Sequence, residues 1–282
     1  MVENSDGIPA DALEDIAYLA KSANRLRLLD TLASGSYSRR DLDERTGIAR
    51  TTIGRIVNEF EERCWAERTP KGEYTTTPVG EQVVTEFMPL VESMGVIREL
   101  GSLVTWIQAV EHPLSLHHLS DATVRWPEQD DPMEILDFFV DLIRDTSEFY
   151  TLNHLAPAVA FTEIMRDRLV ADQLTATCVF TGELVDYIQR RPDRRERWRD
   201  CVAAGADVYR YDGAVPCNLI ILDKRGYIAK SQAEHGNQYT MIESENSVVR
   251  AWAMEVIETH KVDSRRLDTG AFEDPTTAED DR

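Results

Sequence analysis

Residues 38–76 hold the pattern that most restricts what this chain can fold into. Ser38 suits a helix N-cap, and Asp41 follows at the third helical position, an arrangement close to a capping box. Gly47 stands where this first helix must end, because glycine takes a left-handed cap conformation without steric cost. Apolar residues then recur at helical spacing: Ile53, Ile56, Val57 and Phe60. The pattern predicts two short helices joined by a tight turn, with one face of the second helix buried.

The other face of that second helix carries residues suited to contact DNA: Arg50, Thr51, Thr52 and Arg55. Arginine pairs with guanine through two hydrogen bonds, and threonine contacts phosphates, base edges or a thymine methyl group. Gly54 lies among them and would let the helix lie close to a groove. Phosphate contacts are expected at the start of the first helix, from Ser38, Arg39 and Arg40.

A short hairpin is expected after the second helix. Residues 65–68 and 73–76 read as its strands, and the residues between them have turn chemistry. Arg68 and Lys71, at or near the tip, are expected to anchor the hairpin to phosphates or the minor groove. Two helices and a hairpin in this order predict a winged helix-turn-helix that binds double-stranded DNA. Winged folds also serve as protein-interaction modules, so a signalling adaptor stays an alternative.

The charge distribution favours DNA as the partner of this region. The whole chain has a formal charge of -20, whereas residues 21–78 hold eleven basic and nine acidic residues, a net +2. The remainder therefore carries about -22, and an acidic protein has no general affinity for nucleic acid. Only five of the 31 basic residues are lysine, which with the high acid content indicates a halophilic source. An acidic protein from ordinary salt is the alternative.

Length and patterning predict a mainly-α first part followed by an α/β domain with a mixed sheet. We expect disorder at 1–10, the DNA-binding domain at 11–78, a helical linker at 79–110, a regulatory domain at 111–267 and a disordered acidic tail at 268–282. The chain has no run of about 18 apolar residues that would span a membrane, and its start has no apolar run of the kind found in secretion signals. A cytoplasmic location is therefore expected.

The linker carries apolar residues at alternating spacings of four and three, with Gly101 filling one position of the series: Val83, Phe87, Leu90, Met94, Ile97 and Val104. Such a heptad-like seam predicts a helix that pairs two copies of the chain as a homodimer. The alternative is a helix that packs on its own domains. Pro89, Gly95 and Gly101 interrupt the pattern and favour two shorter helices.

Beyond residue 111, short apolar segments alternate with amphipathic helices. Helices are expected at 132–144, 157–171, 181–190, 194–204 and 247–259, and a single helix over 11–34 in the first part. Strands are expected at 115–119, 123–126, 148–152, 174–180, 207–211, 218–223 and 227–230.

Ligands of α/β sheets bind beyond the carboxyl ends of strands. Polar residues at such positions are therefore candidates for binding a small-molecule effector: Asn153, His154, Thr181, Gly182, Asp212 and Asp223. The alternative for each is a turn residue or a helix cap.

Other chemistry finds little support in the sequence. The cysteines, at 64, 178, 201 and 217, lack CxxC spacing, so neither a zinc ribbon nor a disulfide framework is indicated; redox sensing at Cys64 or Cys201 is an alternative. His117 and His118 would face opposite sides of a strand, so no metal site is expected. No cofactor and no enzyme activity are predicted, because nucleophile-elbow, Walker, dinucleotide and His-x-Lys phosphodiesterase motifs are missing. A small-molecule enzyme in the second half stays an alternative.

Residues 46–48, 50–53 and 60–63, with the hairpin, resemble archaeal winged-helix transcription regulators of the broad ArsR-like kind. Residues 214–223 and 245–253 resemble the regulatory domain of haloarchaeal regulators and are similar to the middle domain of a methanogen regulator of filament formation and methanogenesis. The resemblance implies transcription control and a second domain that senses an effector.

Three departures from that family are visible. Cys64 stands where such domains usually have glycine, which puts a left-handed cap there in doubt, and Ala49 replaces the usual Ser or Thr cap of the recognition helix. The cysteine pair of the metal-sensing members is missing, so the resemblance does not imply metal sensing.

Overall fold

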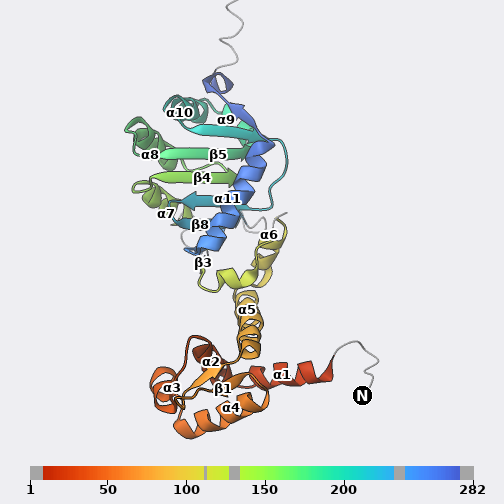
Figure 1. Ribbon diagram of the computed structural model, residues 1–282. Helices are drawn as coiled ribbons and strands as arrows, with labels where there is room; N and C mark the ends of the chain where they lie inside the picture. The colour runs from red at the N-terminus through yellow and green to blue at the C-terminus, as the bar shows by residue number, and fades with distance from the viewer. Residues whose placement is uncertain (1–8, 111–112, 127–133, 232–238, 274–282) are drawn as a thin grey trace, which may run out of the picture. The chain divides into compact units, whose positions relative to one another are not determined.

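The computed structural model describes residues 9–110, 113–126, 134–231 and 239–273. They form two compact units, Met1–Glu92 and Ser93–Arg282, which are considered separately. A helical first part is followed by a mixed-sheet domain, as predicted (Figure 1). No helix in the described part of the chain is long and apolar enough to cross a membrane.

The N-terminal unit is built from short helices and one hairpin. Its elements are α1 (Ala10–Ala20), α2 (Ala23–Ala33), α3 (Arg39–Thr46), α4 (Arg50–Glu62), β1 (Ala66–Arg68), β2 (Tyr74–Thr76) and the first part of α5 (Pro78–Leu100). The two strands pair antiparallel, with Glu67 opposite Thr75. Leu28, Leu42 and Phe60 are fully buried in the core that the helices share.

The turn between α3 and α4 forms as its sequence predicts. The Ser38 hydroxyl accepts a hydrogen bond from the Asp41 amide at 3.2 Å, and the Ser38 amide donates to the Asp41 carboxylate at 2.9 Å. This is a complete capping box. Gly47 ends α3 in the left-handed conformation, with φ of +67°. Cys64 also takes a left-handed conformation, with φ of +57°, so the doubtful cap is present although the residue is not glycine.

Helix α4 begins without a side-chain cap. Ala49 occupies the N-cap position, and no side chain accepts from the first amides. We expect Ala49→Ser to raise the free energy of unfolding of the N-terminal unit by about 1 kcal/mol, because a hydroxyl satisfies one amide. Denaturant unfolding followed by circular dichroism measures this gain. Ala49→Val is the control, and a serine variant no more stable than the valine variant would contradict the prediction.

One helix prediction was wrong, and another is confirmed only in part. The single helix expected over 11–34 is divided between α1 and α2, because Ser22 takes an extended conformation (φ −151°) and starts a new helix. Serine favours such positions because it competes with helical hydrogen bonding. Two shorter helices were expected after Pro78, and two form, but the break lies only at Gly101. Helix α5 continues through Pro89 and Gly95. It ends at Gly101, whose φ of +53° stops it, and a 3-10 turn and α6 (Val104–Gln108) follow.

The second unit is organised on an eight-stranded mixed sheet in the described residues, in the order β10-β6-β5-β4-β7-β8-β9-β3. Its strands are β3 (Thr123–Arg125), β4 (Glu148–Asn153), β5 (Thr175–Thr181), β6 (Asp207–Tyr211), β7 (Asn218–Leu222), β8 (Arg225–Ser231), β9 (Tyr239–Ser244) and β10 (Arg265–Leu267). Strands β4, β5 and β6 are parallel, and all other neighbours pair antiparallel. The predicted mixed sheet is confirmed.

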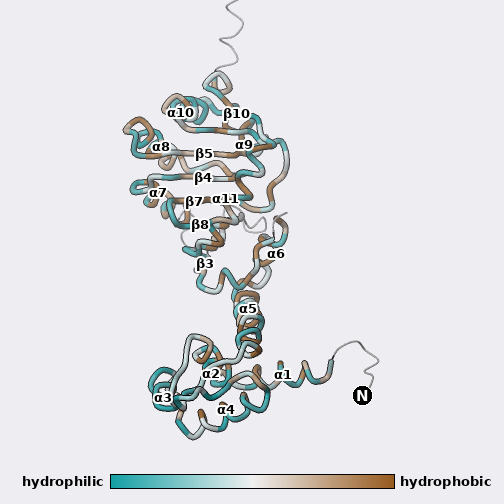
Figure 2. Tube along the Cα trace, viewed as in Figure 1, coloured by the Kyte–Doolittle hydropathy of each residue, from teal (hydrophilic) through white to brown (hydrophobic). Residues whose placement is uncertain are grey.

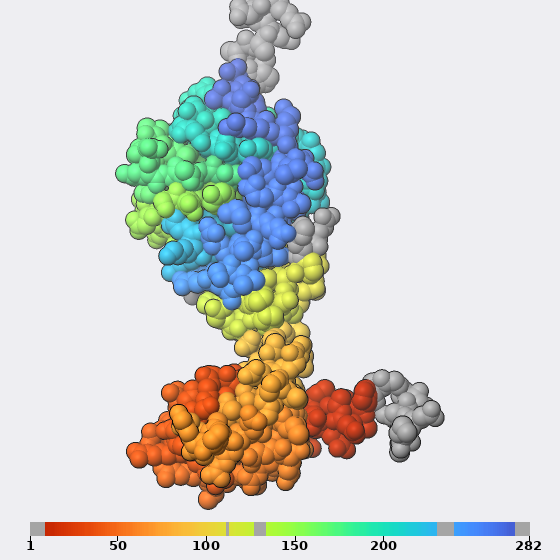
Figure 3. Space-filling model, in the orientation of Figure 1, coloured from red at the N-terminus to blue at the C-terminus, as the bar shows by residue number. Residues whose placement is uncertain are grey.

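Helices cover both faces of this sheet (Figure 1). One face is covered by α7 (Glu134–Ile143), α8 (Val159–Val170), α9 (Gly182–Gln189) and α10 (Pro192–Ala203). The other is covered by α11 (Ser247–Val262) and α6, and α11 lies across the front of the domain in Figure 3. The central strand β7 is mainly hydrophobic in Figure 2, whereas the surface helix α3 is hydrophilic. Each face therefore has its own core, and Trp198 and Ile257 are buried in the two cores.

Three further predictions fail in this domain. The strand expected at 115–119 is a 3-10 turn at Leu116–Leu119, in which the rings of His117 and His118 lie 3.9 Å apart and not on opposite sides. Strands β9 and β10 were not expected. Disorder was expected from residue 268, yet Phe272 is buried in a 3-10 turn. The expected disorder at 1–8 and 274–282 lies outside the described residues.

Candidate nucleic-acid interface and ligand pockets

The two faces of α4 are divided between core and solvent. Ile53, Ile56 and Phe60 are almost fully buried beneath the helix. On the other side Arg50, Thr51 and Arg55 are exposed, and Thr52 is half-buried. Three of the four residues predicted to read bases therefore share one exposed surface at the amino end of α4.

Exposed arginines of α3 and α4 take part in intramolecular ion pairs. Arg50 Nε lies 2.9 Å from Asp43 Oδ2, Arg55 Nη1 lies 2.6 Å from Glu59 Oε1, and Arg40 Nε lies 2.8 Å from Glu44 Oε1. Exposed pairs of this kind contribute only about 0–1 kcal/mol each to stability. Exchanging a carboxylate for a guanine edge or a phosphate therefore costs little.

Glu59 anchors Arg55 more firmly than Asp43 anchors Arg50. The Tyr18 hydroxyl donates to Glu59 at 2.5 Å, and Arg25 lies 3.6 Å from the same carboxylate. The Tyr18 hydrogen bond and the Arg55 contact hold the pKa of Glu59 below its usual range, despite partial burial. Burial and the neighbouring Glu59 raise the pKa of Tyr18. Glu59 thus stays ionised and orients Arg55.

Gly54 makes room for the side chain of Arg39. A Cβ at this position would lie 3.4 Å from Arg39 Nη1, so the guanidinium of Arg39 packs over the glycine. Arg39 also donates to the Tyr74 hydroxyl at 2.9 Å. It therefore ties α3 and α4 to the hairpin.

The hairpin presents the two predicted cations. Arg68 and Lys71 are exposed, and Arg68 lies 5.7 Å above the Tyr74 ring, with its Nε donating to the Gly72 carbonyl at 3.4 Å. Ser38 uses its hydroxyl to cap α3. Arg45 was missed by the sequence reasoning although it is exposed in the last turn of α3, with its guanidinium 4.6 Å above the Tyr37 ring. Its position on the same short helix as Arg40 could have marked it as a further candidate for contact with phosphates.

The structure brings together four of the six candidate effector residues. His154, Thr181, Gly182 and Asp212 line one hollow beyond the carboxyl ends of β4, β5 and β6, with an empty volume of about 800 Å³ that includes open solvent. Asn153 instead lines a separate pocket on the helical side of the sheet. Asp223 lies at the opposite edge, because β7 runs antiparallel to β4.

This strand-end hollow, beyond the carboxyl ends of β4, β5 and β6, contains charged side chains that already pair with one another. Arg210 bridges Asp186 and Asp212, with its Nε 2.6 Å from Asp212 Oδ1. A Cβ on Gly182 would lie 2.7 Å from that carboxylate and 2.8 Å from Arg210 Nη2, so the ion pair covers the glycine. Thr181 caps α9 by accepting from the Leu184 amide. The turn-and-cap alternative therefore fits these residues well.

Asp223 has a structural role at the other edge. Its Oδ1 accepts from the Ser147 amide at 2.9 Å, the Ser147 hydroxyl at 2.8 Å and the Glu148 amide at 2.9 Å. Burial would raise the pKa of Asp223, but these hydrogen bonds outweigh it and hold the pKa below its usual range. The residue fastens the β7–β8 turn to the start of β4.

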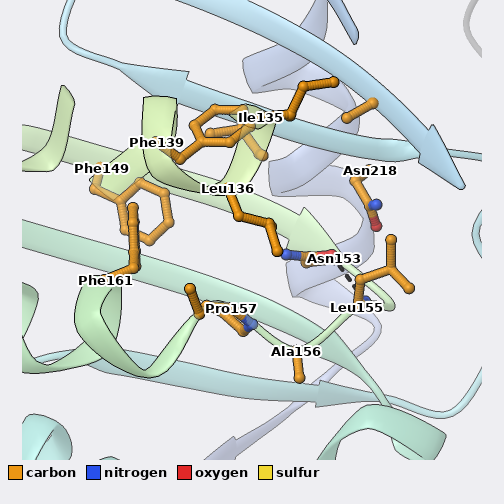
Figure 4. A pocket seen from close by; sticks show the side chains of 13 residues that line it. Ile135, Leu136, Phe139, Phe149, Asn153, Leu155, Ala156, Pro157, Phe161 and Asn218 are labelled. Carbon is orange, nitrogen blue, oxygen red and sulfur yellow. Dashed lines mark hydrogen bonds between the residues drawn. The ribbon is translucent and has the colours of Figure 1, made fainter. Parts of the chain in front are cut away.

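An apolar pocket between the sheet, α7 and α8 was not anticipated from the sequence (Figure 4). Its empty volume is about 610 Å³, including its open side. The lining is mainly aromatic and aliphatic: Ile135, Leu136, Phe139, Phe149, Leu155, Phe161 and Ile220, with Asn153 and Asn218 as the polar members at one end. Each of these residues reads as ordinary core in sequence, so no signal marked the cavity.

Three of the four cysteines are inaccessible. Cys178, Cys201 and Cys217 are buried, and Cys64 is exposed. Burial raises the pKa of Cys201 to about 12, which disfavours the reactive thiolate and the redox alternative at that residue. We expect one thiol per chain to react with a disulfide reagent in the native state and four after unfolding. Absorbance of the released thiolate gives the count, and two or more fast native thiols would contradict this prediction.

Metal-ligating side chains do not gather into a site in the described ranges. No group of three or more His, Cys, Asp or Glu residues within those ranges is arranged to hold a metal ion. His112, which with His117 and His118 forms the histidine cluster in the sequence, lies outside them.

Family models match both parts of the chain. Residues 13–99 match the family model of the HVO_A0261 N-terminal domain, and residues 132–263 match that of the middle domain of the methanogenesis regulatory protein FilR1. The chain is similar to archaeal regulators. The resemblance predicted for the second half is supported, whereas the ArsR-like assignment of the first half stays a prediction. The search of curated proteins found no match.

Solved structures give distant likenesses. TrmBL2, an archaeal chromatin protein, aligns with 92% of this chain over 100% of its own, at 13% identity and a TM-score of 0.41. Nuc, a phospholipase D family member from Salmonella typhimurium, aligns with 52% of this chain over 97% of its own, at 6% identity and a TM-score of 0.41. Likenesses at this level do not bear on function.

Proposed function

We propose that the chain is a sequence-specific DNA-binding transcription regulator. The observation that carries the proposal is the exposed end of α4, where Arg50, Thr51 and Arg55 face solvent while the apolar side of the helix is buried. A helix of this kind fits the major groove, where arginine and threonine read base edges. The match to a domain of a regulatory protein supports the same class of function.

The N-terminal unit works, on this proposal, as a winged helix-turn-helix. Helix α4 is the recognition helix, and the residues with direct contacts to bases are Arg50, Thr51, Thr52 and Arg55. Phosphates are contacted from α3 by Ser38, Arg39 and Arg40, and from the β1–β2 wing by Arg68 and Lys71. Support comes from the order of the elements and from the exposure of the charged members of both sets.

Two copies of the chain bind one operator. Helix α5 carries exposed apolar side chains at Leu90, Met94 and Ile97, which is the spacing of a coiled-coil seam. Pairing through this face would place two recognition helices on half-sites about one helical turn apart. Val83 and Phe87, predicted as part of the same seam, pack partly buried against the N-terminal core instead. The dimer contact is therefore confined to the middle of the predicted seam.

The sheet domain senses an effector, and this changes the geometry of the dimer and hence its affinity for DNA. Support comes from a pocket in that domain.

The protein works in the cytoplasm of a salt-rich cell, as the acidic, lysine-poor composition favours. In concentrated salt the release of counterions drives binding weakly, so groove contacts and dimer formation carry most of the affinity.

Binding to DNA from upstream of its own gene, in molar KCl, tests this function. Fluorescence anisotropy of a labelled duplex compares the wild-type chain with the double variant Arg50→Ala/Arg55→Ala. Because a specific arginine contact is worth about 1–3 kcal/mol, we expect the double variant to bind at least about thirtyfold more weakly. Random DNA of equal length gives the non-specific reference.

A matched control removes two equally exposed arginines from surface ion pairs elsewhere. Arg144 pairs with Asp141 and Arg266 pairs with Asp207, and their side chains are 58% and 69% exposed, against 59% and 58% for Arg50 and Arg55. The Arg144→Ala/Arg266→Ala variant should bind DNA as the wild type does. A signalling adaptor or an enzyme would show no preference over random DNA, and its function would be the same in both double variants.

A further inference from the structure

We propose that the apolar pocket between α7, α8 and the sheet is the effector site, and that its ligand is a small neutral molecule with a ring-sized apolar body and one carbonyl oxygen. The inference rests on the proposed effector role of the sheet domain. It differs from the strand-end hollow, where Arg210 is already neutralised by Asp186 and Asp212.

The walls of the pocket select the apolar body of the ligand. Phe139 comes from α7, Phe149 from β4 and Phe161 from α8, and the rings of Phe149 and Phe161 meet edge to face at 5.3 Å. Leu136 and Ile220, both half-buried, complete the lining around these rings. Aromatic walls with few polar groups are typical of small-molecule sites.

Two carboxamides at one end select the polar atom. Asn153 and Asn218 are only 9% and 3% exposed. Asn153 Oδ1 accepts from the Leu155 amide at 2.9 Å, and Asn218 Oδ1 accepts from the His154 amide at 3.0 Å. Because both oxygens are held by backbone amides, the side-chain NH₂ groups are the donors left to a ligand. In Figure 4 the nitrogen of Asn153 points toward Leu136, across the pocket.

The absence of charge decides between a carbonyl and a carboxylate. None of the described residues that line the pocket is charged. A carboxylate would lose its hydration without gaining a cation, which is costly, whereas a ketone, ester or amide oxygen is satisfied by NH₂ donors. The loop that forms one wall is fixed from outside, because Arg194 donates to the Pro157 carbonyl at 2.9 Å. The site is therefore held in shape without a ligand.

Fluorine NMR with three ring probes tests this inference on the full chain in molar KCl without DNA. The probes are 4-fluoroacetophenone, 1-ethyl-4-fluorobenzene, which lacks the carbonyl, and 4-fluorobenzoate, which is charged. We expect saturable binding of the ketone with a dissociation constant of about 1 mM or below, as suits a ligand of this size. The other two probes should bind at least about tenfold more weakly, the value of one hydrogen bond.

Variants assign the binding to this pocket. Leu136→Trp fills the cavity and should abolish ketone binding, whereas Val170→Trp, on the exposed side of α8, should leave it unchanged. Asn153→Asp keeps the acceptor for the Leu155 amide but replaces the donor with an acceptor, so it should weaken the ketone about tenfold. Asn58→Asp, at an exposed site in α4, is its matched control. Circular dichroism verifies that each variant is folded.

Several results would overturn the inference. They are no saturable shift with the folded wild-type chain, equal binding of ketone and hydrocarbon, or full ketone binding in the folded Leu136→Trp variant. The two proposals can fail separately. If the chain binds the ketone but shows no preference for any DNA, the pocket proposal stands and the DNA-binding proposal fails. If the chain prefers its own DNA but does not bind the ketone, only the pocket proposal fails.

Discussion

Replacing Leu90, Met94 and Ile97 with glutamate is expected to convert a dimer into monomers. These side chains are 50%, 58% and 42% exposed on α5, so the change removes an apolar surface without disturbing a core. Burying the exposed part of each side chain in a dimer contributes about 1 kcal/mol, six side chains contribute in all, and the new carboxylates repel one another. We expect the dissociation constant of the dimer to rise at least about a thousandfold.

Sedimentation velocity in molar KCl measures this change, as a fall from twice the chain mass to 32.1 kDa. The control carries three glutamates at exposed valines of the sheet domain, Val170, Val248 and Val262, and should stay dimeric. The monomeric variant should also lose most of its DNA affinity, because two half-sites can no longer act together. A wild-type chain that is monomeric at every concentration, or a control that dissociates equally, would contradict the predicted seam.

Gly80→Ala is expected to unfold the N-terminal unit. A Cβ at Gly80 would lie 1.9 Å from the Trp65 carbonyl oxygen, which is itself fixed by a hydrogen bond from the Thr77 amide at 3.0 Å. Backbone rather than a flexible side chain blocks the new atom, so the start of α5 must move away from the hairpin. We expect a loss of more than about 4 kcal/mol, a large part of the stability of a small domain.

Thermal unfolding followed by circular dichroism measures this loss. Gly95→Ala is the control, since it lies in the same helix and, apart from its chain neighbours and the helix's own backbone, no atom lies within 4 Å of the place that its new methyl group would take. It should be neutral or stabilising by up to about 1 kcal/mol. Both variants change one hydrogen to one methyl group in α5, and only their surroundings differ. A Gly80→Ala chain that melts with the wild type would contradict the close approach of α5 to Trp65.

Features that depend only on residues close together in the chain were predicted correctly from the sequence. The Ser38–Asp41 capping box and the Gly47 cap depend only on neighbours in the chain, and both form as expected. The apolar spacing of α4 also predicted its buried face, because helical periodicity is a property of one segment. The same holds for β5, whose apolar run identifies it without knowledge of its partners.

What the sequence did not reveal depends on contacts between distant segments. Strand β10 has only three residues, Arg265–Leu267, and becomes a strand because the edge of β6 offers it partners. Asp223 was grouped with Thr181 because strand direction is not visible in a single segment, yet β7 runs antiparallel to β4. The apolar pocket is lined by residues from helices, strands and a loop. The sequence of each of these segments, taken alone, looks like that of an ordinary core segment.

The most direct test of the DNA-binding role is a genome-wide pull-down of the chain from cells that make it. Wild type and Arg50→Ala/Arg55→Ala are compared, with Arg144→Ala/Arg266→Ala as the control for two lost surface charges. A sequence-specific regulator whose α4 reads bases should give discrete sites for the wild type and the control, and none for the Arg50/Arg55 variant. The same sites in all three, or no enriched DNA with the folded wild type, would contradict this role.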